Sequence, residues 1–271
     1  MKLHRRSCFV ALLAAAALLA GCAVTRPVGP APTPEARVAL TPTGALRVGV
    51  YAGSPTSLVV DKHGRNAGVA HDLGKELARW LNSPFELVEF NRIAEVIEAM
   101  KAGQIDFTLT NATEARARDV DFTLPLVSLE LGYLAPPGSK LRNANEIDRA
   151  GLRVGVSEGS TSQGLLSRTH RQAQVVPVSS LKAAIEQLRL GQLDVFATNK
   201  GILHEMADSL PGARVLEGRW GLEKLAIAIP KGRQAALPYL SQFALSVRRD
   251  GTLQSATERA GLRGTVEPAF R

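Results

Sequence analysis

The sequence has very little cysteine, few aromatic residues and no long apolar run beyond its first 21 residues. Its only two cysteines are Cys8 and Cys22, and aromatic residues make up 5% of the 271 residues. Two cysteines near one end cannot staple a fold of this length, whereas an apolar content of 45% is ample for a hydrophobic core. Because no later apolar run reaches membrane-spanning length, the sequence predicts no transmembrane helix after the N-terminal segment.

The N-terminal segment, residues 1–21, is typical of a secretory signal peptide. A basic start, MKLHRRS, is followed by an Ala-rich apolar run and by Leu19-Ala20-Gly21 before Cys22. This end resembles a bacterial lipobox, which implies that Cys22 is lipid-modified; an ordinary signal peptide with a chance cysteine is the alternative. Removal of the segment takes Cys8 and three basic residues with it, so the formal charge falls from +8 to +5.

A moderate positive charge without any Lys/Arg run indicates no nucleic-acid partner. Residues 22–44 contain five prolines among small residues, a composition that cannot bury a core and that keeps the chain extended. We therefore expect a Pro-rich tether over 22–44 and a folded body that starts near Ala45.

From Leu46 the chain alternates strand and helix, and the pattern restarts at Leu152 with the same five residues, LRVGV. In the first half, periodicity predicts helices at 72–81 and 93–100 and strands at 85–90 and 105–110. In the second half it predicts strands at 175–178 and 194–198 and a helix at 179–190 capped by Ser179 or Ser180. A second internal similarity, MKAGQIDFTLTN against LRLGQLDVFATN, fits either an internal duplication or the similar turns that βαβ units commonly use.

This alternation predicts an α/β protein with two Rossmann-like lobes joined by a two-strand hinge. Extended segments at 124–136 and 221–230 are expected to pass between the lobes, with residues 45–128 and 224–271 in lobe 1 and 129–223 in lobe 2. In open α/β sheets ligands sit beyond the carboxyl ends of the strands. Two lobes that face each other therefore form a cleft, which two crossing strands allow to close on a ligand.

Several short stretches, in their order and spacing, resemble the amino-acid type of bacterial extracellular solute-binding protein (family 3). They are LRVGV, Gly68 with Asp72-Leu73, AMKAGQID, TNATEARARDVDFT, VGVSEGST, LGQLDVFATN and RRDGTL, and they cover about residues 45–265. The resemblance implies the type II periplasmic-binding fold, a small solute as ligand, no cofactor, and a monomer that delivers its ligand to an ABC permease in the inner membrane.

Arg116 is the first candidate ligand-binding residue, because it lies five residues before Asp121-Phe122 as the family pattern requires. The resemblance implies that its guanidinium forks onto the ligand carboxylate, a pairing for which two parallel N–H donors are well suited. A solvated arginine on a helix face, like Arg118, is the alternative.

Further candidates lie in the loops of both lobes. Ser160 and Thr161 open a helix after the second LRVGV, where free N–H groups and hydroxyls attract an anion or simply cap the helix. Asn111 and Thr113 occupy the matching loop of lobe 1.

Three departures from the family pattern bear on the ligand. Asn199 stands where relatives usually have an aspartate for the ligand ammonium, and it carries no charge. Ser54 stands where an aromatic clamp is common, which leaves Tyr51 as the nearest aromatic, and Gly68-Val69-Ala70 replaces Gly-Phe-Asp. These changes suggest a carboxylate ligand that need not be an α-amino acid, or else a weakened amino-acid binder.

The sequence favours a lipid-anchored binding protein over an enzyme or a sensor. It has no nucleophile, phosphate-loop or zinc-protease motif, and His63, His71, His170 and His204 show no metal spacing. A dehydratase acting on prephenate-like acids would need a carboxyl acid, for which Glu158 is the candidate. A ligand-sensing module for a membrane receptor would use the same cleft. We expect a protein at the periplasmic face of the envelope, where Ala23 after Cys22 also allows outer-membrane export.

Overall fold

The computed structural model describes residues 29–266. The expected signal peptide, the lipidation site Cys22 and the start of the tether lie outside these residues. Within them, no helix is both long and apolar enough to cross a membrane.

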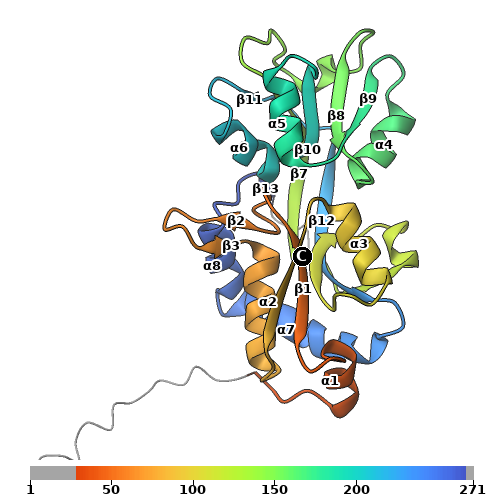
Figure 1. Cartoon of the computed structure of the whole chain (residues 1–271), viewed down its shortest axis with the longest axis vertical. Helices are drawn as coiled ribbons and strands as arrows, with labels where there is room; N and C mark the ends of the chain where they lie inside the picture. Colours follow the sequence, from red (N-terminus) through yellow and green to blue (C-terminus); the bar gives the residue numbers. More distant parts are fainter. Residues whose placement is uncertain (1–28, 267–271) are drawn as a thin grey trace, which may run out of the picture.

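The chain forms two lobes, one above the other, with two long strands running between them (Figure 1). Lobe 1 is built from both ends of the described chain. Its elements are α1 (Pro34–Leu40), β1 (Leu46–Tyr51), β2 (Val59–Val60), β3 (Asn66–Ala67), α2 (Val69–Trp80), β4 (Phe85–Phe90), α3 (Ile93–Lys101), β5 (Thr108–Asn111), η1 (Arg116–Arg118), β6 (Val120–Phe122), η3 (Gln234–Ala236), α7 (Leu237–Arg249) and α8 (Thr252–Arg259).

Lobe 2 is one continuous stretch between the two crossing strands. Its elements are η2 (Ala144–Glu146), β8 (Arg153–Ser157), α4 (Thr161–Thr169), β9 (Gln174–Val178), α5 (Leu181–Arg189), β10 (Val195–Asn199), α6 (Lys200–Asp208) and β11 (Arg214–Val215). Ser180 is the N-cap of α5, where its side chain accepts a hydrogen bond from the backbone of Ala183. The predicted alternation of strands and helices is confirmed in both lobes, with helix starts shifted by up to three residues.

The crossing segments are β7 (Val127–Ala135) and β12 (Gly221–Pro230), which pair antiparallel with each other. In lobe 1, β12 pairs antiparallel with β5, and β1 pairs parallel with β4. In lobe 2, β7 pairs antiparallel with β10, and β8 lies parallel to both β10 and β9. Each lobe thus holds parallel strands closed by one antiparallel crossing strand, so the expected α/β architecture with a two-strand hinge is confirmed.

Each lobe contains the same clip between an arginine on its first strand and an aspartate that follows a helix. Arg47 of β1 donates from its backbone N, Nε and Nη2 to the carboxylate of Asp106 at 2.8–3.1 Å, and Nη2 also reaches a glycine carbonyl in the preceding turn. Arg153 of β8 makes the equivalent four hydrogen bonds with Asp194 and its own turn glycine. The two echoes found in the sequence, LRVGV and Gly-Gln-aliphatic-Asp, are therefore the two halves of one structural unit that is used twice.

The glycine of each LRVGV strand belongs to the same unit. A Cβ at Gly49 would lie 2.2 Å from Cδ1 of Ile105, and a Cβ at Gly155 would lie 2.5 Å from Cδ1 of Leu193. These two aliphatic residues immediately precede the clip aspartates. Each strand needs a glycine here because the neighbouring aliphatic side chain fills the space that a Cβ would take.

The prediction of a tether over residues 22–44 is wrong for the last part of that range, because residues 34–40 form helix α1 and pack onto lobe 1. The side chain of Thr33 caps the helix by accepting from Ala36 N at 3.2 Å, and Pro34 occupies the first turn, where its missing N–H costs nothing. Ala36 and Leu40 are buried in the core beside α2 and α7. The folded body therefore starts near Thr33.

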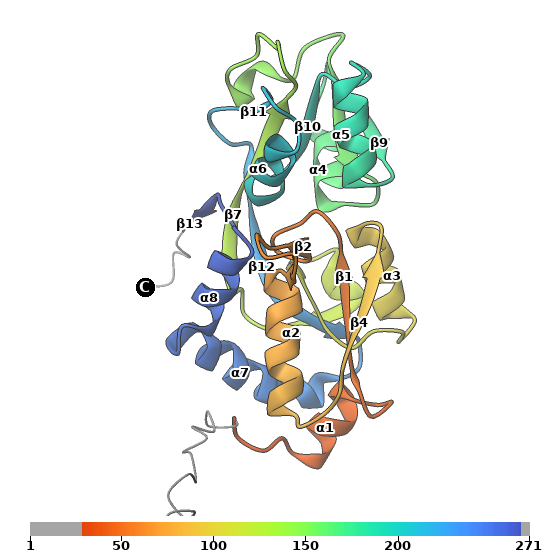
Figure 2. The same ribbon diagram turned by 60° about the vertical axis from the view of Figure 1, so that its left-hand side comes forward.

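The end of the chain forms a third link at the waist of the molecule. After α8, the short strand β13 (Thr265–Val266) pairs antiparallel with β7 and lies beside it (Figure 2). Arg263, just before β13, forms an ion pair with Asp208 of α6 in lobe 2. The last described residues thus connect the C-terminal helices of lobe 1 to the far side of the hinge.

Candidate functional site

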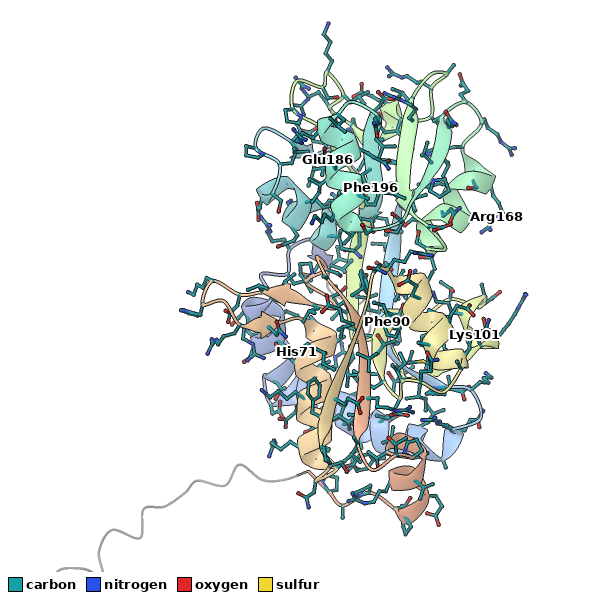
Figure 3. The ribbon with its side chains drawn as sticks, in the orientation of Figure 1. His71, Phe90, Lys101, Arg168, Glu186 and Phe196 are labelled. Atoms are coloured by element: carbon teal, nitrogen blue, oxygen red, sulfur yellow. The ribbon has the colours of Figure 1, made fainter. Side chains whose placement is uncertain are left out.

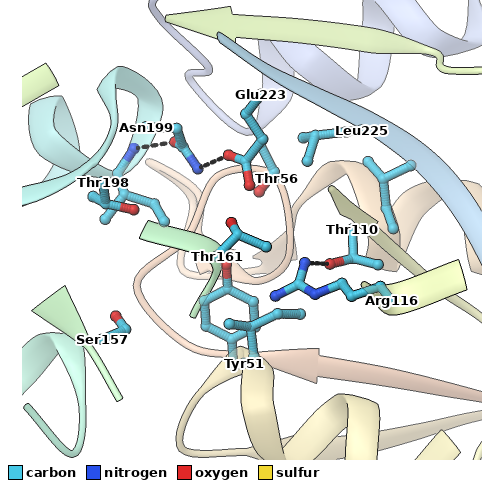
Figure 4. A pocket seen from close by; sticks show the side chains of 13 residues that line it. Tyr51, Thr56, Thr110, Arg116, Ser157, Thr161, Thr198, Asn199, Glu223 and Leu225 are labelled. Atoms are coloured by element: carbon cyan, nitrogen blue, oxygen red, sulfur yellow. Dashed lines mark hydrogen bonds between the residues drawn. The ribbon is translucent and has the colours of Figure 1, made fainter. Parts of the chain in front are cut away.

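A small polar cavity of about 30 Å³ lies where the two lobes meet (Figure 4). Its polar lining comes from both lobes and from β12, and its apolar lining consists of Ile93, Leu109, Ile202 and Leu225. The polar residues are Tyr51, Thr56, Thr110, Arg116, Ser157, Thr161, Thr198, Asn199 and Glu223. A volume of this size holds about two water molecules, so a larger solute requires the lobes to part and close again around it.

The predicted site residues divide between this cavity and a neighbouring groove. Four of them line the cavity: Tyr51, Arg116, Thr161 and Asn199. Asn111, Thr113 and Ser160 line a larger outer groove of about 480 Å³, which shares Arg116 and Thr161 with the cavity. Ser54 lines neither pocket. It is fully buried beneath the cavity, where its hydroxyl lies 2.9 Å from that of Thr56.

Arg116 is a buried cation at the floor of the cavity. The 3₁₀ turn η1 follows β5, and Nη1 of Arg116 donates a hydrogen bond to the hydroxyl of Thr110. Among residues 29–266, no carboxylate lies within ion-pairing distance of this guanidinium. Burial lowers its pKa, opposed mainly by the negative charge of Glu223. A guanidinium stays protonated at physiological pH, so the cavity offers an anion a cation with unused donors.

Glu223 is a functional candidate that the sequence analysis missed. Along β12, Glu223 and Leu225 face the cavity, whereas Leu222 and Lys224 line the outer groove, as the alternation of a strand requires. Burial raises the pKa of Glu223, while the charge of Arg116 and a hydrogen bond from Asn199 lower it. The signal that could have found it is an acidic residue inside the mainly apolar crossing segment GLEKLAIAIP, where Glu223 and Lys224 are the charged residues.

Asn111 and Asn199 end the equivalent strands β5 and β10; Asn111 bonds across the cleft, and Asn199 bonds the hinge strand β12. Nδ2 of Asn111 donates to the hydroxyl of Thr161 in lobe 2 at 3.3 Å, while its Oδ1 accepts from Lys224 N. Oδ1 of Asn199 caps helix α6 by accepting from Ile202 N, and its Nδ2 donates to Glu223 at 2.8 Å. The Thr-Asn echo in the sequence therefore marks the cleft-facing ends of these two strands.

The last residue of β1 supplies the aromatic wall of the cavity. Tyr51 lies at the end of β1 and packs against apolar residues of both lobes. Burial raises its pKa to about 12, opposed by hydrogen bonding from Ser54 and by the charge of Arg116. The phenol is therefore neutral at physiological pH and acts as a wall and a hydrogen-bonding group.

The start of helix α4 faces the cavity from lobe 2. Ser160 is its N-cap and accepts from Gln163 N at 3.1 Å, while Thr161 is the first helical residue and lines the cavity. N–H groups in the first turn of a helix have no partner within the helix and favour negative charge. The Ser160 side chain is thus used as a cap, whereas the hydroxyl of Thr161 points toward the site.

Direct contacts hold the lobes together at the mouth of the cleft. Nη2 of Arg92, at the start of α3, lies 3.3 Å from Oε2 of Glu158 in lobe 2. A Cβ at Gly159 would lie 2.6 Å from Cβ of Ala94, so the backbones approach closely there. Glu158, the candidate acid for an enzyme, is half-exposed, paired with Arg92, and not among the residues that line the cavity.

The histidines within residues 29–266 are not among the residues that line the cavity. His71 lies on α2 in lobe 1 (Figure 3). It bonds Asp72 through Nδ1 at 2.7 Å and packs edge-on against Phe85. His170 lies 3.1 Å from the hydroxyl of Tyr133 within lobe 2. Within residues 29–266, no three His, Cys, Asp or Glu side chains gather in a way that could hold a metal ion.

Two lobes, two crossing strands and a polar cavity between the lobes are the architecture of a two-lobed binding protein. The family model described as "Bacterial extracellular solute-binding proteins, family 3" matches residues 46–261, and the chain belongs to this family. Its members act in the periplasm or outside the cell, and the chain has the type II periplasmic-binding fold of its structural neighbours.

Three similar proteins illustrate the relationship. The ABC transporter glutamine-binding protein GlnH of Bacillus subtilis (strain 168) is 24% identical over 192 residues, which are 69% of this chain and 70% of the relative. The crystal structure of a solute receptor for L-cysteine of Neisseria gonorrhoeae has a TM-score of 0.74 and 25% identity, and the match covers 83% of this chain and 92% of that chain. An ancestral amino acid-binding protein, AncCDT-1, described as a precursor of cyclohexadienyl dehydratase, has a TM-score of 0.71 and 23% identity over 82% of this chain and 97% of its own. At that identity the likeness concerns the fold alone.

Proposed function

We propose that this protein captures a small carboxylate-bearing solute, an amino acid or a close relative of one, and presents it to an ABC permease. The observation that carries the proposal is the buried guanidinium of Arg116, which faces the cavity with a single neutral partner, Thr110. A buried cation of this kind is costly unless an anion arrives to pair with it. Two similar proteins, a glutamine-binding protein and a solute receptor for L-cysteine, support an amino-acid-like ligand.

Closure of the lobes is the proposed mechanism. The ligand carboxylate would meet Arg116 from lobe 1 and the start of α4, with Thr161, from lobe 2, so binding energy favours the closed form. The strands β7 and β12 act as the hinge. The closed form is then the state that a membrane partner would recognise.

The envelope location belongs to the same proposal. Cys22 would carry a lipid that holds the protein, as a monomer, at the periplasmic face of a membrane. A permease partner favours the inner membrane, whereas Ala23 after Cys22 is compatible with the outer membrane. The segment between Cys22 and Thr33 would leave the lobes free to reach the permease.

A thermal-shift screen tests the ligand class directly. The panel contains amino acids, α-keto acids and other small carboxylates, with uncharged amides of the same size as controls. At about 100 times the dissociation constant, a ligand stabilises the protein by about 2.7 kcal/mol, which corresponds to a shift of about 5–10 °C for a protein of this size. Stabilisation by carboxylates and not by their amides is the expected result. If no carboxylate shifts the transition, the proposal is wrong.

The ion pair between Arg92 and Glu158 is expected to favour closure only slightly. Glu158→Gln removes the charge without changing the size of the side chain. Because the pair is partly exposed, it contributes about 0.2–1 kcal/mol, so ligand affinity should fall by about 1.4- to fivefold. The effect is measured by isothermal titration calorimetry, and it should vanish in about 1 M salt.

The matched control for this variant is Glu186→Gln, because Glu186 pairs with Arg189 inside helix α5, far from the cleft. Its affinity should equal that of the wild type at every salt concentration. Equal affinities for Glu158→Gln and Glu186→Gln at low salt would show that the Arg92–Glu158 pair does not influence closure.

A further inference from the structure

The carboxylate of Glu223 lines the cavity. It forms no ion pair with any residue between 29 and 266. Its one hydrogen-bond donor among residues 29–266 is the amide of Asn199, at 2.8 Å from Oε2. Burial disfavours the ionised form and raises the pKa of the group. A half-buried carboxylate with one neutral donor is costly in free energy, so its presence in the cavity favours a cationic partner.

Arg116 does not supply that partner by contact. The two side chains line the same cavity but lie apart in the close view, where the Tyr51 ring lies beside Arg116 (Figure 4). Each feels the charge of the other, but no ion pair joins them. A positive and a negative group that face one space without touching match a ligand that carries both charges.

The identity of residue 199 fits this arrangement. An aspartate here would place a second carboxylate against Glu223, and two carboxylates at hydrogen-bond distance cannot both stay ionised. Asn199 avoids the repulsion, because its amide donates to Glu223 while its carbonyl caps α6. The apparent loss of a charge at position 199 is therefore compensated by a carboxylate on the crossing strand.

We infer that Glu223 is the cation-binding group of the cavity, and that the ligand is a zwitterion whose ammonium binds Glu223 while its carboxylate binds Arg116. This inference rests on the proposed function and narrows it from carboxylates in general to small amino acids. Position 223 lies on the hinge strand itself. Ligand binding thus ties both lobes to the element about which they rotate.

The inference predicts that the affinity for an amino acid depends on pH. An ammonium binds the ionised carboxylate, so affinity should fall as the pH drops through the pKa of Glu223, which burial raises above the ordinary 4.5. The groups that face Glu223 are Arg116, Tyr51 and Asn199. Arg116 stays charged, burial keeps Tyr51 neutral by raising its pKa to about 12, and Asn199 does not titrate. A fall in affinity between pH 8 and pH 5 therefore reports on Glu223.

The test compares amino acids with acids that lack only the amino group. The probe pairs are L-alanine with propionate and L-glutamine with glutaramate, titrated into the full mature protein by calorimetry at pH 8 and pH 5. For the wild type we expect at least one amino acid to bind about 100-fold more tightly than its deaminated partner at pH 8. In Glu223→Gln the ratio should fall below about tenfold, and the pH dependence should disappear.

Two further variants keep the outcome interpretable. Glu223→Asp retains the charge and should retain the preference for the amino acid. Glu89→Gln, which removes an exposed carboxylate on β4, should behave as the wild type at both pH values. If Glu223→Gln does not fold, the wild-type protein still tests the inference. Its preference for the amino acid over the deaminated acid, and the pH dependence of that preference, are then the deciding measurements.

The outcomes separate the two levels of the proposal. If both members of a pair bind the wild type and Glu223→Gln with an unchanged ratio, the role of Glu223 is wrong while capture of a carboxylate stands. If the deaminated acid binds the wild type as tightly as the amino acid, the zwitterion is wrong. If neither these probes nor the wider carboxylate panel bind, the proposed function fails and the inference fails with it.

Discussion

Replacing Arg116 with alanine is expected to weaken binding of a carboxylate ligand by about 100-fold or more while leaving the unliganded protein folded. The variant removes charge-assisted hydrogen bonds and leaves the ligand carboxylate buried without a cation, at a combined cost of about 3 kcal/mol or more. A loss of 1.4 kcal/mol is a factor of ten in the dissociation constant, so 3 kcal/mol is about 100-fold. Calorimetry with any acid that stabilises the wild type measures the effect.

The stability of the same variant separates a ligand-binding role from a structural one. Burial lowers the pKa of Arg116, which means that the protein holds the charged guanidinium at a cost. Its removal should therefore leave the melting temperature of the unliganded protein roughly unchanged or higher, as is common for residues kept for function. If Arg116 had a structural role, Arg116→Ala would lower both the ligand affinity and the melting temperature.

Two companion variants sharpen this prediction. Arg118→Ala removes an exposed arginine two residues away in the same turn and should bind as the wild type does. Arg116→Lys keeps the charge but loses the planar fork, so an intermediate affinity is expected. If Arg116→Ala binds as tightly as Arg118→Ala, the assignment of the carboxylate site to Arg116 is wrong.

The sequence could predict the lobes because their pattern is local. Strand and helix periodicity, with glycine between the elements, marks each βαβ unit without knowledge of its partners. The repeated LRVGV and Gly-Gln-aliphatic-Asp segments were visible as echoes. Their physical link, the clip of Arg47 with Asp106 and of Arg153 with Asp194, depends on contacts that span more than 40 residues and required the structure.

The sequence analysis does not predict helix α1, because the high proline content of this segment favours an extended chain over a helix. Five prolines between residues 23 and 44 favour an extended tether, yet Thr33-Pro34 is itself a good helix start. Ala36 and Leu40 become helical because lobe 1 offers them an apolar surface beside α2 and α7. A seven-residue helix is unstable alone, so only tertiary packing explains it.

Within the candidate site, sequence reasoning found the residues that end strands and start helices. Arg116 and Thr161 follow β5 and β8, where ligand-binding loops are expected in an α/β fold. Glu223 was missed because it lies within a crossing strand, and a strand pattern alone does not say which face meets the ligand. The sequence alone presents Asn199 as a simple loss of charge for the same reason. Its hydrogen-bond partner, Glu223, is 24 residues away in the chain.

Asp106→Asn is expected to destabilise lobe 1 by about 3 kcal/mol or more. The Asp106 side chain is fully buried and pairs with two arginines, Arg47 at 2.8 Å and Arg233 at 2.6 Å. Asparagine keeps the shape but turns one acceptor into a donor that faces the guanidinium groups. Removing one partner from a buried ionic cluster typically costs 3–5 kcal/mol, because the remaining charges are left without compensation.

Lobe 2 supplies the matched control. Asp194→Asn breaks the equivalent clip with Arg153, but there the aspartate side chain is 30% exposed and the arginine 39%. Water replaces the lost partner at such a site, so the expected cost is about 1 kcal/mol or less. The two variants therefore change the same residue type in the same motif and differ mainly in burial.

The position of the two tryptophans makes the comparison specific to a lobe. Trp80 is buried in lobe 1 against Tyr239 and Phe243, whereas Trp220 packs on Tyr133 at the base of lobe 2. In a Trp220→Phe background, urea unfolding followed by fluorescence reports lobe 1, while circular dichroism reports the whole chain. Asp106→Asn should shift the Trp80 transition to clearly lower urea, and Asp194→Asn should leave it nearly in place. Equal shifts for the two variants would mean that burial does not distinguish the clips, and that the added contact with Arg233 contributes nothing to lobe 1.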